Sequence, residues 1–393
     1  MSGYIIRAVL ENPSHEEYGQ FTVDFPISRE AYADTLERLN ALEMGDVLAQ
    51  DCRIAELDSH YTILKRLEGA AANVDELDYL AKRLDSFCTG EDAQLQAMAC
   101  RLGVSDIRDF ISLTFCCQQA TVITDFSNLE QIGRQHQMTL HGGTMPMEEY
   151  RAIDGEKEAL SLIRNTEGTV TPYGVVYDNG MRLEQSYQGG CFPPYLYEPS
   201  VLALEAESPR GVCLLGLPAP EEQLQRMLAR AGTPGELRVV MDELPEIAAG
   251  FIDLEHLKPE DLPALNQLCQ AIEPMGERTL EKLDAACLLA KPQDSEALCR
   301  LAEHLEEFLF VPDVRTPEEY GRYMIQQSGH FEYDENLEGF YDYRHYGEER
   351  LRLEGGTFNE CGYTAYLGEG SLEELVSGQR QEPSEMRAEG MQL

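Results

Sequence analysis

Residues 312–322 read "PDVRTPEEYGR", and this stretch decides how the rest of the chain is organised. Residues 124–134, "TDFSNLEQIGR", align with it, so that Asp125 matches Asp313 and Gly133 matches Gly321. Matches that recur at one fixed offset are the mark of an internal repeat. The stretch therefore predicts that part of the chain is duplicated.

The same stretch also predicts a helix. The residues "TPEE" at 316–319 supply a capping threonine, a proline suited to the first turn and a glutamate that completes a capping box. We expect a helix over 317–327. In the first half of the chain, Ser28 is the expected cap of a helix at 29–41.

Two further matches support the duplication. "ELDYLAKRL" from Glu76 aligns with "ALNQLCQAI" from Ala264 at the same offset as the glycines, and both place leucines on one apolar helix stripe. "FPISREAYADTLERL" from Phe25 resembles "LPAPEEQLQRML" from Leu217. Before these come β-type segments, "YIIRAVLEN" and "GQFTVDFPI" in the first half and "RGVCLLGLPA" in the second.

The predicted fold is α+β, an elongated multi-domain chain of small α/β modules with acidic helices in two copies. In "VVYDNGMRLE", Asn179-Gly180 between alternating residues predicts a β-hairpin. The predicted parts are a partial first copy (1–145), a Tyr-, Gly- and Pro-rich β insert or linker (146–198), a second, more complete copy (199–367), and a tail (368–393). The second copy is divided into an N-terminal α/β module (199–257), a helical module (258–315) and a C-terminal module (316–367).

Composition limits the class of protein. The 393 residues are 43% apolar, which is enough for packed cores, and carry a formal net charge of −40. No apolar run is long enough for a membrane span, and the N-terminus does not read as a secretory signal. The eleven cysteines lack Cys-x-x-Cys spacing and mostly lie in apolar contexts, so we expect buried free thiols in a cytoplasmic protein.

Motifs for catalysis are missing. The sequence has no phosphate-binding loop, dinucleotide fingerprint, His-Glu-x-x-His or nucleophile elbow. Histidines are dispersed, and pairs of carboxylates arise by chance among 71 acids. We therefore predict no enzyme activity, no cofactor and no metal. A hydrolase with an unrecognised site is kept as a hypothesis that ranks below the two binding functions given at the end of this section.

The densest group of bases lies in "GFYDYRHYGEERLRLEGGTF" at 339–358. Acids outnumber the arginines there, which opposes phosphate binding, and the chain's charge repels nucleic acid. We expect Tyr341, Tyr343 and Tyr346 to pack a small domain. Its arginines are expected to pair with nearby carboxylates.

Distributed negative charge on helices remains. B-DNA carries about one charge per ~1.7 Å of axis, and a helix rises about 1.5 Å per residue. Acids three or four apart, as at Glu303, Glu306 and Glu307, share a helix face. Such faces could imitate phosphates or could simply be solvated, and charge alone does not separate the two.

The stretch from Pro317 to Tyr366 resembles the C-terminal part of the ArdA antirestriction family. The residues that carry the resemblance are Tyr341-Asp342-Tyr343, Gly347, Leu351, Glu354-Gly355 and Gly362-Tyr363. The resemblance covers about 199–367 well. It covers 1–145 partly, because the Tyr-Asp-Tyr module is missing after Gly133-Arg134.

The resemblance implies a non-enzymatic, acidic protein of a mobile genetic element such as a conjugative transposon, usually dimeric. Family members imitate B-DNA and occupy the DNA groove of type I restriction–modification enzymes. This chain is about twice the usual family length, which leaves three roles open for the duplication: lengthening the mimic, standing in for a dimer partner, or redirecting the protein to another target.

We therefore predict an antirestriction DNA mimic that binds a type I restriction–modification complex rather than nucleic acid or membrane. The alternative is a non-mimic acidic module of a mobile element that binds another basic host or defence protein. The acids expected to replace phosphates are Glu221, Glu222, Asp261, Glu303, Glu306, Glu307, Glu318, Glu319 and Asp334.

Overall fold

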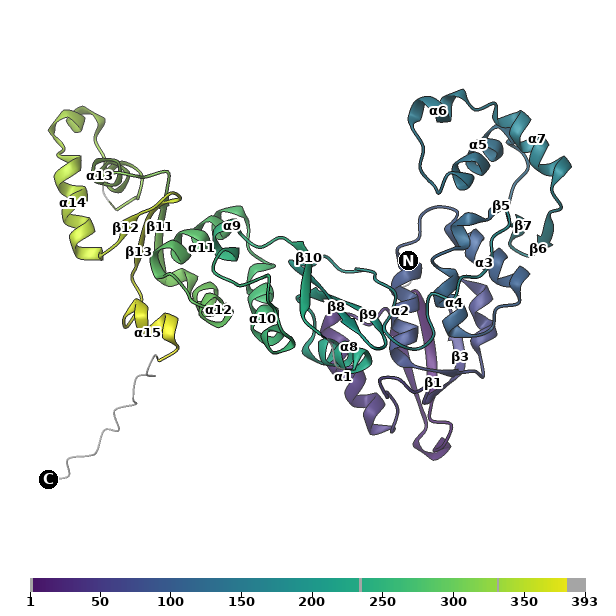
Figure 1. The fold of residues 1–393 in the computed structure, drawn as a ribbon. Helices are drawn as coiled ribbons and strands as arrows, with labels where there is room; N and C mark the ends of the chain where they lie inside the picture. Colours follow the sequence, from purple (N-terminus) through teal and green to yellow (C-terminus); the bar gives the residue numbers. More distant parts are fainter. Residues whose placement is uncertain (1–2, 233–234, 331, 380–393) are drawn as a thin grey trace. The chain divides into compact units, whose positions relative to one another are not determined.

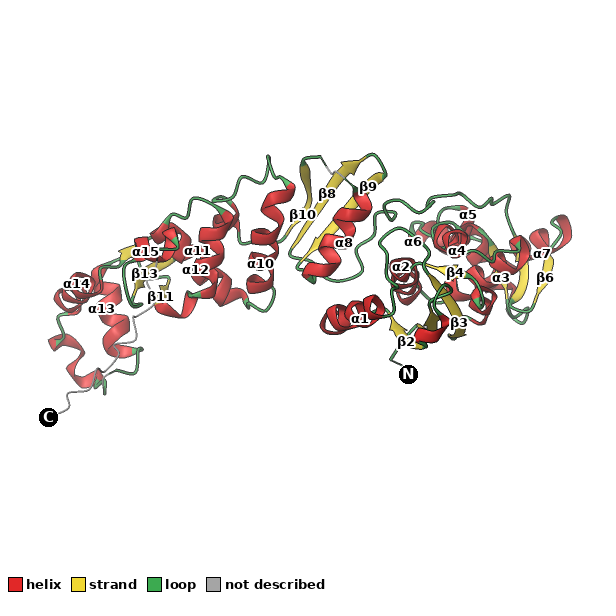
Figure 2. Ribbon diagram, turned by 90° about the horizontal axis from the view of Figure 1, so that it is seen from below, coloured by secondary structure: helices red, strands yellow, loops and turns green. Residues whose placement is uncertain are grey.

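The computed structural model describes residues 3–232, 235–330 and 332–379 (Figure 1). Helices make up 46% and strands 17%, and the strands form several small separate sheets (Figure 2). The predicted α+β fold of small modules is therefore confirmed. The chain divides into two compact units: unit 1 comprises 1–197, 207–214 and 220–234, and unit 2 comprises 198–206, 215–219 and 235–393.

Unit 1 begins with an antiparallel sheet of order β2-β1-β3-β4. Both predicted strands and the helix at 29–41 are confirmed, and the Ser28 hydroxyl accepts a hydrogen bond from the Ala31 amide. The elements of this module are β1 (Ile6–Glu11), η1 (Glu16–Tyr18), β2 (Gln20–Phe25), α1 (Arg29–Ala41), β3 (Cys52–Asp58), η2 (Thr62–Leu67) and β4 (Ala71–Ala72).

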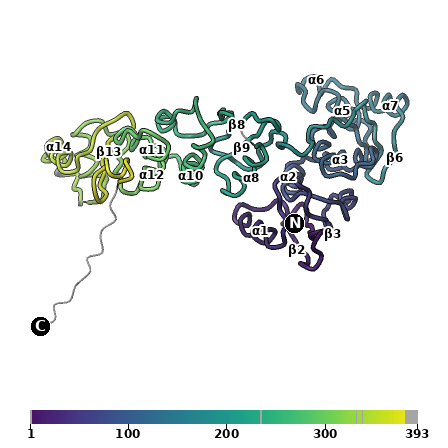
Figure 3. The backbone as a smooth tube through the Cα atoms, turned by 60° about the horizontal axis from the view of Figure 1, so that its bottom comes forward, coloured from purple at the N-terminus to yellow at the C-terminus, as the bar shows by residue number. Residues whose placement is uncertain are grey.

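Unit 1 continues with a helical group, a helix pair and a sheet of order β5-β7-β6. Figure 3 shows the course of the backbone through this part, from β3 through α3 to α5, α6 and α7. A single apolar core joins the first sheet to the helical group. The elements are α2 (Val74–Asp85), α3 (Glu91–Leu102), α4 (Ile107–Leu113), η3 (Cys117–Gln119), β5 (Thr121–Ile123), α5 (Leu129–Leu140), α6 (Met147–Ala152), α7 (Gly155–Asn165), β6 (Thr169–Thr171) and β7 (Gly174–Tyr177).

The later half of the chain repeats this succession, with sheets of order β10-β8-β9 and β11-β13-β12. The predicted helix at 317–327 is confirmed, and its capping box joins Thr316 and Glu319. The elements are β8 (Leu202–Ser208), β9 (Gly211–Leu217), α8 (Glu221–Ala231), β10 (Leu237–Asp242), α9 (Glu246–Ala249), η4 (Pro259–Asp261), α10 (Leu262–Ile272), α11 (Glu277–Ala290), α12 (Ser295–Glu303), η5 (Leu305–Glu307), β11 (Phe308–Pro312), α13 (Pro317–Gln326), η6 (Glu335–Phe340), α14 (Tyr343–Glu354), β12 (Thr357–Phe358), β13 (Gly362–Tyr366) and α15 (Leu372–Ser377).

The fixed offset between Gly133 and Gly321 extends to hydrogen-bond register. Val122 stands opposite Val176 in the sheet of unit 1, and their counterparts Phe310 and Thr364 stand opposite each other in the sheet of unit 2. Helix starts keep the same offset. The paired N-cap residues are Asn73 and Asp261, Asp106 and Asp294, Asn128 and Thr316, and Asp154 and Asp342.

Each unit contains one helix pair held together through glycine, α5 with α7 and α13 with α14 (Figures 1 and 2). A Cβ built on Gly133 would overlap the Gly155 carbonyl, and one built on Gly321 would overlap the Tyr343 carbonyl. Only glycine lets the two helix backbones approach this closely.

These elements change the expected organisation of 146–198. The sequence suggests that a module is missing after Gly133-Arg134. The structure has α7, β6 and β7 there, at the positions that α14, β12 and β13 take in the second copy. Residues 155–177 are thus the counterpart of 343–365 rather than an insert. The Tyr-Asp-Tyr sequence is absent there because Gly155 stands where the second copy has Tyr343.

The predicted hairpin at Asn179-Gly180 is wrong. The turn forms, with positive φ at both residues, but no strand follows it in 181–186. β7 already pairs with β5 on one edge and β6 on the other, so it has no edge left for a third partner.

The predicted tail at 368–393 is only partly described. Its first part contains α15, which Ser371 and Glu374 cap reciprocally and which buries Leu375. Residues 372–377 are therefore part of the folded unit, and 380–393 lie outside the described residues.

The stretch at 339–358 forms the end of η6, α14 and β12, and its tyrosines and arginines behave as expected. Tyr343 is buried, its hydroxyl accepts from Gln326 Nε2 at 3.0 Å, and its ring packs near that of Tyr341. Each arginine pairs with a carboxylate along the helix. The pairs are Arg344 with Glu348, Arg350 with Glu354 and Arg352 with Glu349.

All eleven cysteines are free thiols, and seven are buried. Within the described ranges, none of the helices has the length and apolar character needed to cross a membrane.

Candidate partner-binding surface

Acidic excess is larger in unit 2. Unit 2 contains 37 acidic and 13 basic residues, whereas unit 1 contains 34 and 18. The predicted acids are divided between them, with Glu221 and Glu222 in unit 1 and the other seven in unit 2.

Glu221 and Glu222 lie exposed in the first turn of α8. Carboxylates are favoured at this end because the helix dipole presents partial positive charge there. Glu221 also accepts a hydrogen bond from Gln225 Nε2 at 3.0 Å. The pair is accessible, and its position has a sufficient structural explanation.

Glu303 and Glu306 lie exposed at the end of α12 and in η5, as the shared-face prediction requires. Glu307 differs, because its side chain is only 20% exposed and accepts hydrogen bonds from Tyr366 Oη at 2.8 Å and His304 Nδ1 at 3.2 Å. It fastens η5 to the end of β13 and contributes little charge to the surface.

Three of the predicted acids are caps. Glu319 accepts from the Arg315 and Thr316 amides, and the hydrogen bond from the Arg315 amide is the main cause of its lowered pKa. Asp261 accepts from the Lys258 amide at 2.8 Å, and Asp334 accepts from the Asn336 amide at 2.9 Å. Their carboxylates are committed to helix ends.

Glu318 is exposed beside Glu319 in the first turn of α13, and its carboxylate lies 3.8 Å from the Arg322 guanidinium. An exposed pair at this distance is weak and leaves the carboxylate available to a stronger cation. Glu303, Glu306 and Glu318 are therefore the accessible members of the predicted set in unit 2.

A denser group was missed by sequence reasoning. Glu246 begins α9, Glu281 and Asp284 lie on α11, and Glu360 lies in the turn between β12 and β13. We call these four residues the α11 acidic face. The charges of Glu246 and Glu360 raise the pKa of Asp284. The charges of Asp284, Glu360 and Glu281 raise the pKa of the Cys361 thiol beside them.

The charge of Asp284 in the α11 acidic face is unfavourable to folding. Burial raises the pKa of Asp284, and the charges of Glu246 and Glu360 raise it further, although the Ala248 and Ile247 amides act in the opposite direction. Arg315 is the nearby cation, and its guanidinium donates to the Glu360 carbonyl at 3.0 Å. Asp284 thus lies beside two like charges, and Arg315 is a cation close to the same place.

One sequence signal could have found part of this face. Glu277, Glu281 and Asp284 have i, i+4 and i+7 spacing, which places them on one side of a helix. Glu246 and Glu360 join them only through tertiary folding, so no local pattern identifies them.

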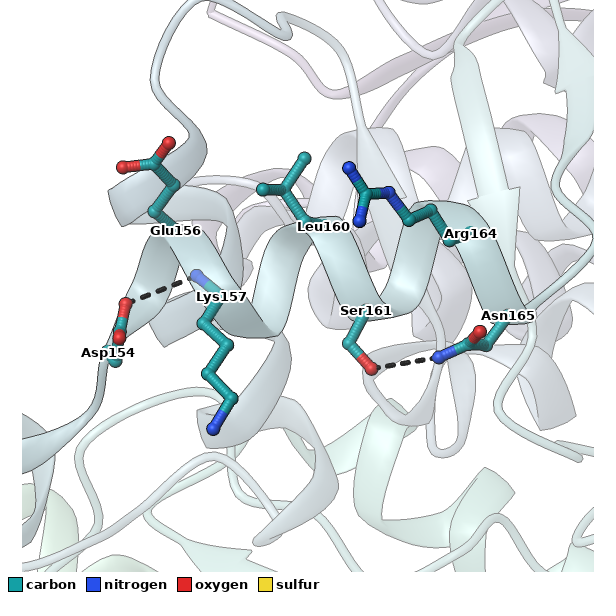
Figure 4. A pocket seen from close by; sticks show the side chains of 7 residues that line it. All are labelled: Asp154, Glu156, Lys157, Leu160, Ser161, Arg164 and Asn165. Atoms are coloured by element: carbon teal, nitrogen blue, oxygen red, sulfur yellow. Dashed lines mark hydrogen bonds between the residues drawn. The ribbon is translucent and has the colours of Figure 1, made fainter.

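A shallow hollow lies along α7 in unit 1 (Figure 4). Its lining residues come from the cap and one side of this single helix. Ser161 Oγ accepts from Asn165 Nδ2 at 3.1 Å, and Asp154 caps the Lys157 amide at 3.2 Å. The serine therefore faces an amide instead of a general base, and the lining residues include no nucleophile–base pair.

Within residues 3–232, 235–330 and 332–379, no three His, Cys, Asp or Glu side chains converge as metal ligands would. No protein-family model matches the chain, and no curated protein matches it either.

Proposed function

We propose that the protein is an antirestriction factor that imitates B-DNA and competes for the DNA-binding groove of a type I restriction–modification enzyme. The exposed carboxylates would take the places of phosphates against lysine and arginine side chains. The observation that carries the proposal is the α11 acidic face, where Asp284 interacts with the like charges of Glu246 and Glu360, and where Glu281 and Asp284 both act on the Cys361 thiol.

Retention of like charges supports a binding role over simple solubility. Solubility needs dispersed charge, whereas adjacent carboxylates lower the stability of the folded state. A surface that meets a cationic partner regains that free energy on binding, because each carboxylate then acquires an opposite charge.

The target class is proposed from the resemblance of 317–366 to the ArdA family. The repeated succession of modules fits it, since two copies in one chain would provide what two subunits provide in a dimeric relative. The chain would then act as a pseudo-dimer. No step in this mechanism needs a cofactor or a reaction.

Competition with DNA tests the proposal. A type I methyltransferase core is bound to fluorescent duplex DNA and titrated with the protein at several salt concentrations. We expect displacement of the duplex, with an affinity that falls steeply as salt rises. Failure of excess duplex to displace the bound protein would contradict mimicry and favour the alternative, an acidic module that binds another basic protein.

Matched variants assign the binding to a surface. The triple variant Glu246→Gln, Glu281→Gln and Glu360→Gln removes three charges from the α11 acidic face, and we expect at least about tenfold weaker binding. The control triple Asp34→Asn, Glu37→Gln and Glu56→Gln removes three exposed charges from unit 1. Equal losses in both triples would show that only net charge matters.

A further inference from the structure

Two cysteines of unit 1 come together from distant parts of the sequence. Cys191 lies in the segment 182–197, which follows β7 and which we call the strap, and Cys213 lies on β9. The Cys191 amide donates to the Arg210 carbonyl at 3.1 Å, and the Cys191 Cβ lies 3.5 Å from where a Cβ of Gly211 would stand. Since alternate strand residues share a face, Cys213 points to the same side as Gly211.

The two side chains are neighbours, and their thiols lie near enough to interact. The Cys191 Sγ lies 3.5 Å from Ser208 Oγ, and the Cys213 Sγ lies 3.9 Å from the Met227 carbonyl oxygen, to which it donates. Cys213 is buried, whereas Cys191 is half-buried and so keeps a path to solvent. Cys191 is the member of the pair that a small reagent can reach.

The surroundings favour a thiolate on Cys191. The hydrogen bond from Cys213 lowers the pKa of Cys191, with smaller contributions from Ser208 and from the charges of Arg230 and Arg210. The pKa of Cys213 is raised, mainly by its interaction with Cys191 and by burial. The two thiols are therefore suited to different roles, Cys191 to that of the nucleophile and Cys213 to that of the resolving thiol.

The strap is otherwise held firmly on unit 1. Tyr187 is buried and its hydroxyl accepts from Arg230 Nη1 at 2.8 Å, while Phe192 stacks on the rings of Tyr187 and Tyr79. The Tyr79 hydroxyl donates to the Pro193 carbonyl at 2.7 Å. These contacts hold the strap, and with it Cys191, against the folded part of unit 1.

We propose that Cys191 and Cys213 are a redox-sensitive pair that forms a disulfide on exposure to a peroxide and so links the strap to β9. The Cys191 thiolate attacks one oxygen of hydrogen peroxide, the O–O bond breaks, and the leaving hydroxide takes a proton to become water. Cys191 is now a sulfenic acid, and its negative charge has been lost.

The second step follows from that loss of charge. The thiol of Cys213 no longer faces an anion, so its proton is released more easily, and its sulfur attacks the sulfur of Cys191. The S–O bond breaks, and the hydroxide leaves with the proton as a second water. The two thiols lose two electrons and two protons in total, and the peroxide accepts both.

Peptide mapping of the full-length protein tests the proposal. The protein is treated with one equivalent of hydrogen peroxide at pH 7, blocked with an alkylating reagent and digested without reductant. We expect a 191–213 linked peptide that dithiothreitol removes. We also expect Cys191 in the untreated protein to be alkylated about tenfold faster than the exposed Cys88.

Variants separate the two steps. In Cys213→Ser, Cys191 should stop as a sulfenic acid that dimedone labels, and in Cys191→Ser, Cys213 should remain reduced. Ser208→Ala should slow the reaction of Cys191 without preventing the linked product, and circular dichroism confirms that each variant folds. A stable sulfenic acid on Cys191 in the unmodified sequence, or links of Cys191 to other cysteines, would overturn the proposal.

Discussion

The two units place carboxylates at different positions of the repeat and in opposite environments. In α2 of unit 1, Asp75, Glu76 and Asp78 point into ion pairs with Arg226, Arg108 and Lys82 at 2.8 to 2.9 Å. At the corresponding positions of the second copy, α10 has Pro263, Ala264 and Asn266. Unit 1 therefore uses acids inside its core, whereas the same helix of unit 2 has none there.

The relation is reversed on the next helix. Glu281 and Asp284 of α11 correspond to Ala93 and Gln96 of α3. Asp284 accepts from the Ala248 amide at 2.8 Å, and Gln96 accepts from the Ile63 amide at 3.4 Å, so both side chains bind the start of a short neighbouring helix. A neutral amide suffices for that structural task, so the charge of Asp284 is a feature that the second copy has and the first copy lacks.

The largest expected effect tests what the two copies share. Gly321→Val should destabilise unit 2, and Gly133→Val unit 1, each by more than about 4 kcal/mol, because the new side chain would strike the backbone of the partner helix. Urea unfolding followed by circular dichroism measures both.

Gly339→Ala is the matched control, since nothing lies within 4 Å of a Cβ built there. We expect it to change stability by less than about 0.5 kcal/mol. If Gly133→Val were as mild as this control, the close packing of α5 on α7 would be disproved.

The buried ion pairs of unit 1 give the next largest effect. Arg230→Met removes the partner that donates to Asp75 at 3.3 Å, Asn73 at 2.8 Å and Tyr187 at 2.8 Å. We expect a loss of about 3–5 kcal/mol, because buried polar groups are left without a partner. Urea unfolding checks this, and the exposed Arg344→Met should cost less than about 1 kcal/mol.

Substitutions of Tyr343 test the C-terminal module, whose Tyr-Asp-Tyr sequence is present in the second copy and absent from the first. Tyr343→Ala should cost about 3 kcal/mol through lost packing against Tyr341 and Arg322. Tyr343→Phe should cost about 1 kcal/mol, since the ring stays in place while the hydrogen bond between the hydroxyl and Gln326 is lost. Both are measured by urea unfolding. Intact stability of Tyr343→Ala together with lost inhibition would show that the tyrosine binds the partner instead.

Placing a carboxylate on α3, at the position that corresponds to Asp284 of α11, tests whether unit 1 tolerates the charge that unit 2 has there. Gln96→Glu gives unit 1 the carboxylate that α11 has, but Gln96 is only 8% exposed. We expect a loss of about 1–3 kcal/mol at pH 7, measured by urea unfolding. Gln135→Glu, on the exposed side of α5, is the control and should be nearly neutral; equal effects would mean that burial at Gln96 does not matter.

Much of the fold could be predicted from the sequence because it depends on local chemistry. The capping box at Thr316, the N-cap at Ser28 and the matched leucine stripes act within one element, so spacing reveals them. The last module of the first copy escaped notice for a physical reason. Its sheet is defined by backbone hydrogen bonds, and Gly155 stands where the second copy has a recognisable tyrosine.

The candidate site was less accessible to such reasoning. Among the predicted acids, Glu307 turned inward to Tyr366, and Glu319 served as a cap, because a carboxylate near a free amide or hydroxyl binds it. The α11 acidic face depends on Glu246 and Glu360, which tertiary folding brings to Asp284 from opposite sides in sequence.

The smallest effect concerns the charge of Asp284 itself. Burial raises its pKa, so the folded protein holds the proton to a higher pH than the unfolded chain does. Stability from this group is complete below the unfolded pKa of about 4 and falls as pH rises through the higher folded value. Asp284→Asn keeps the acceptor for the Ala248 amide and removes the charge. It should therefore stabilise unit 2 by roughly 0.5 kcal/mol at pH 7, with the gain disappearing near pH 4 in urea unfolding. A gain of equal size at both pH values would mean that ionisation of Asp284 is not its source, and the cost assigned to the α11 acidic face would then have to lie with Glu246 and Glu360.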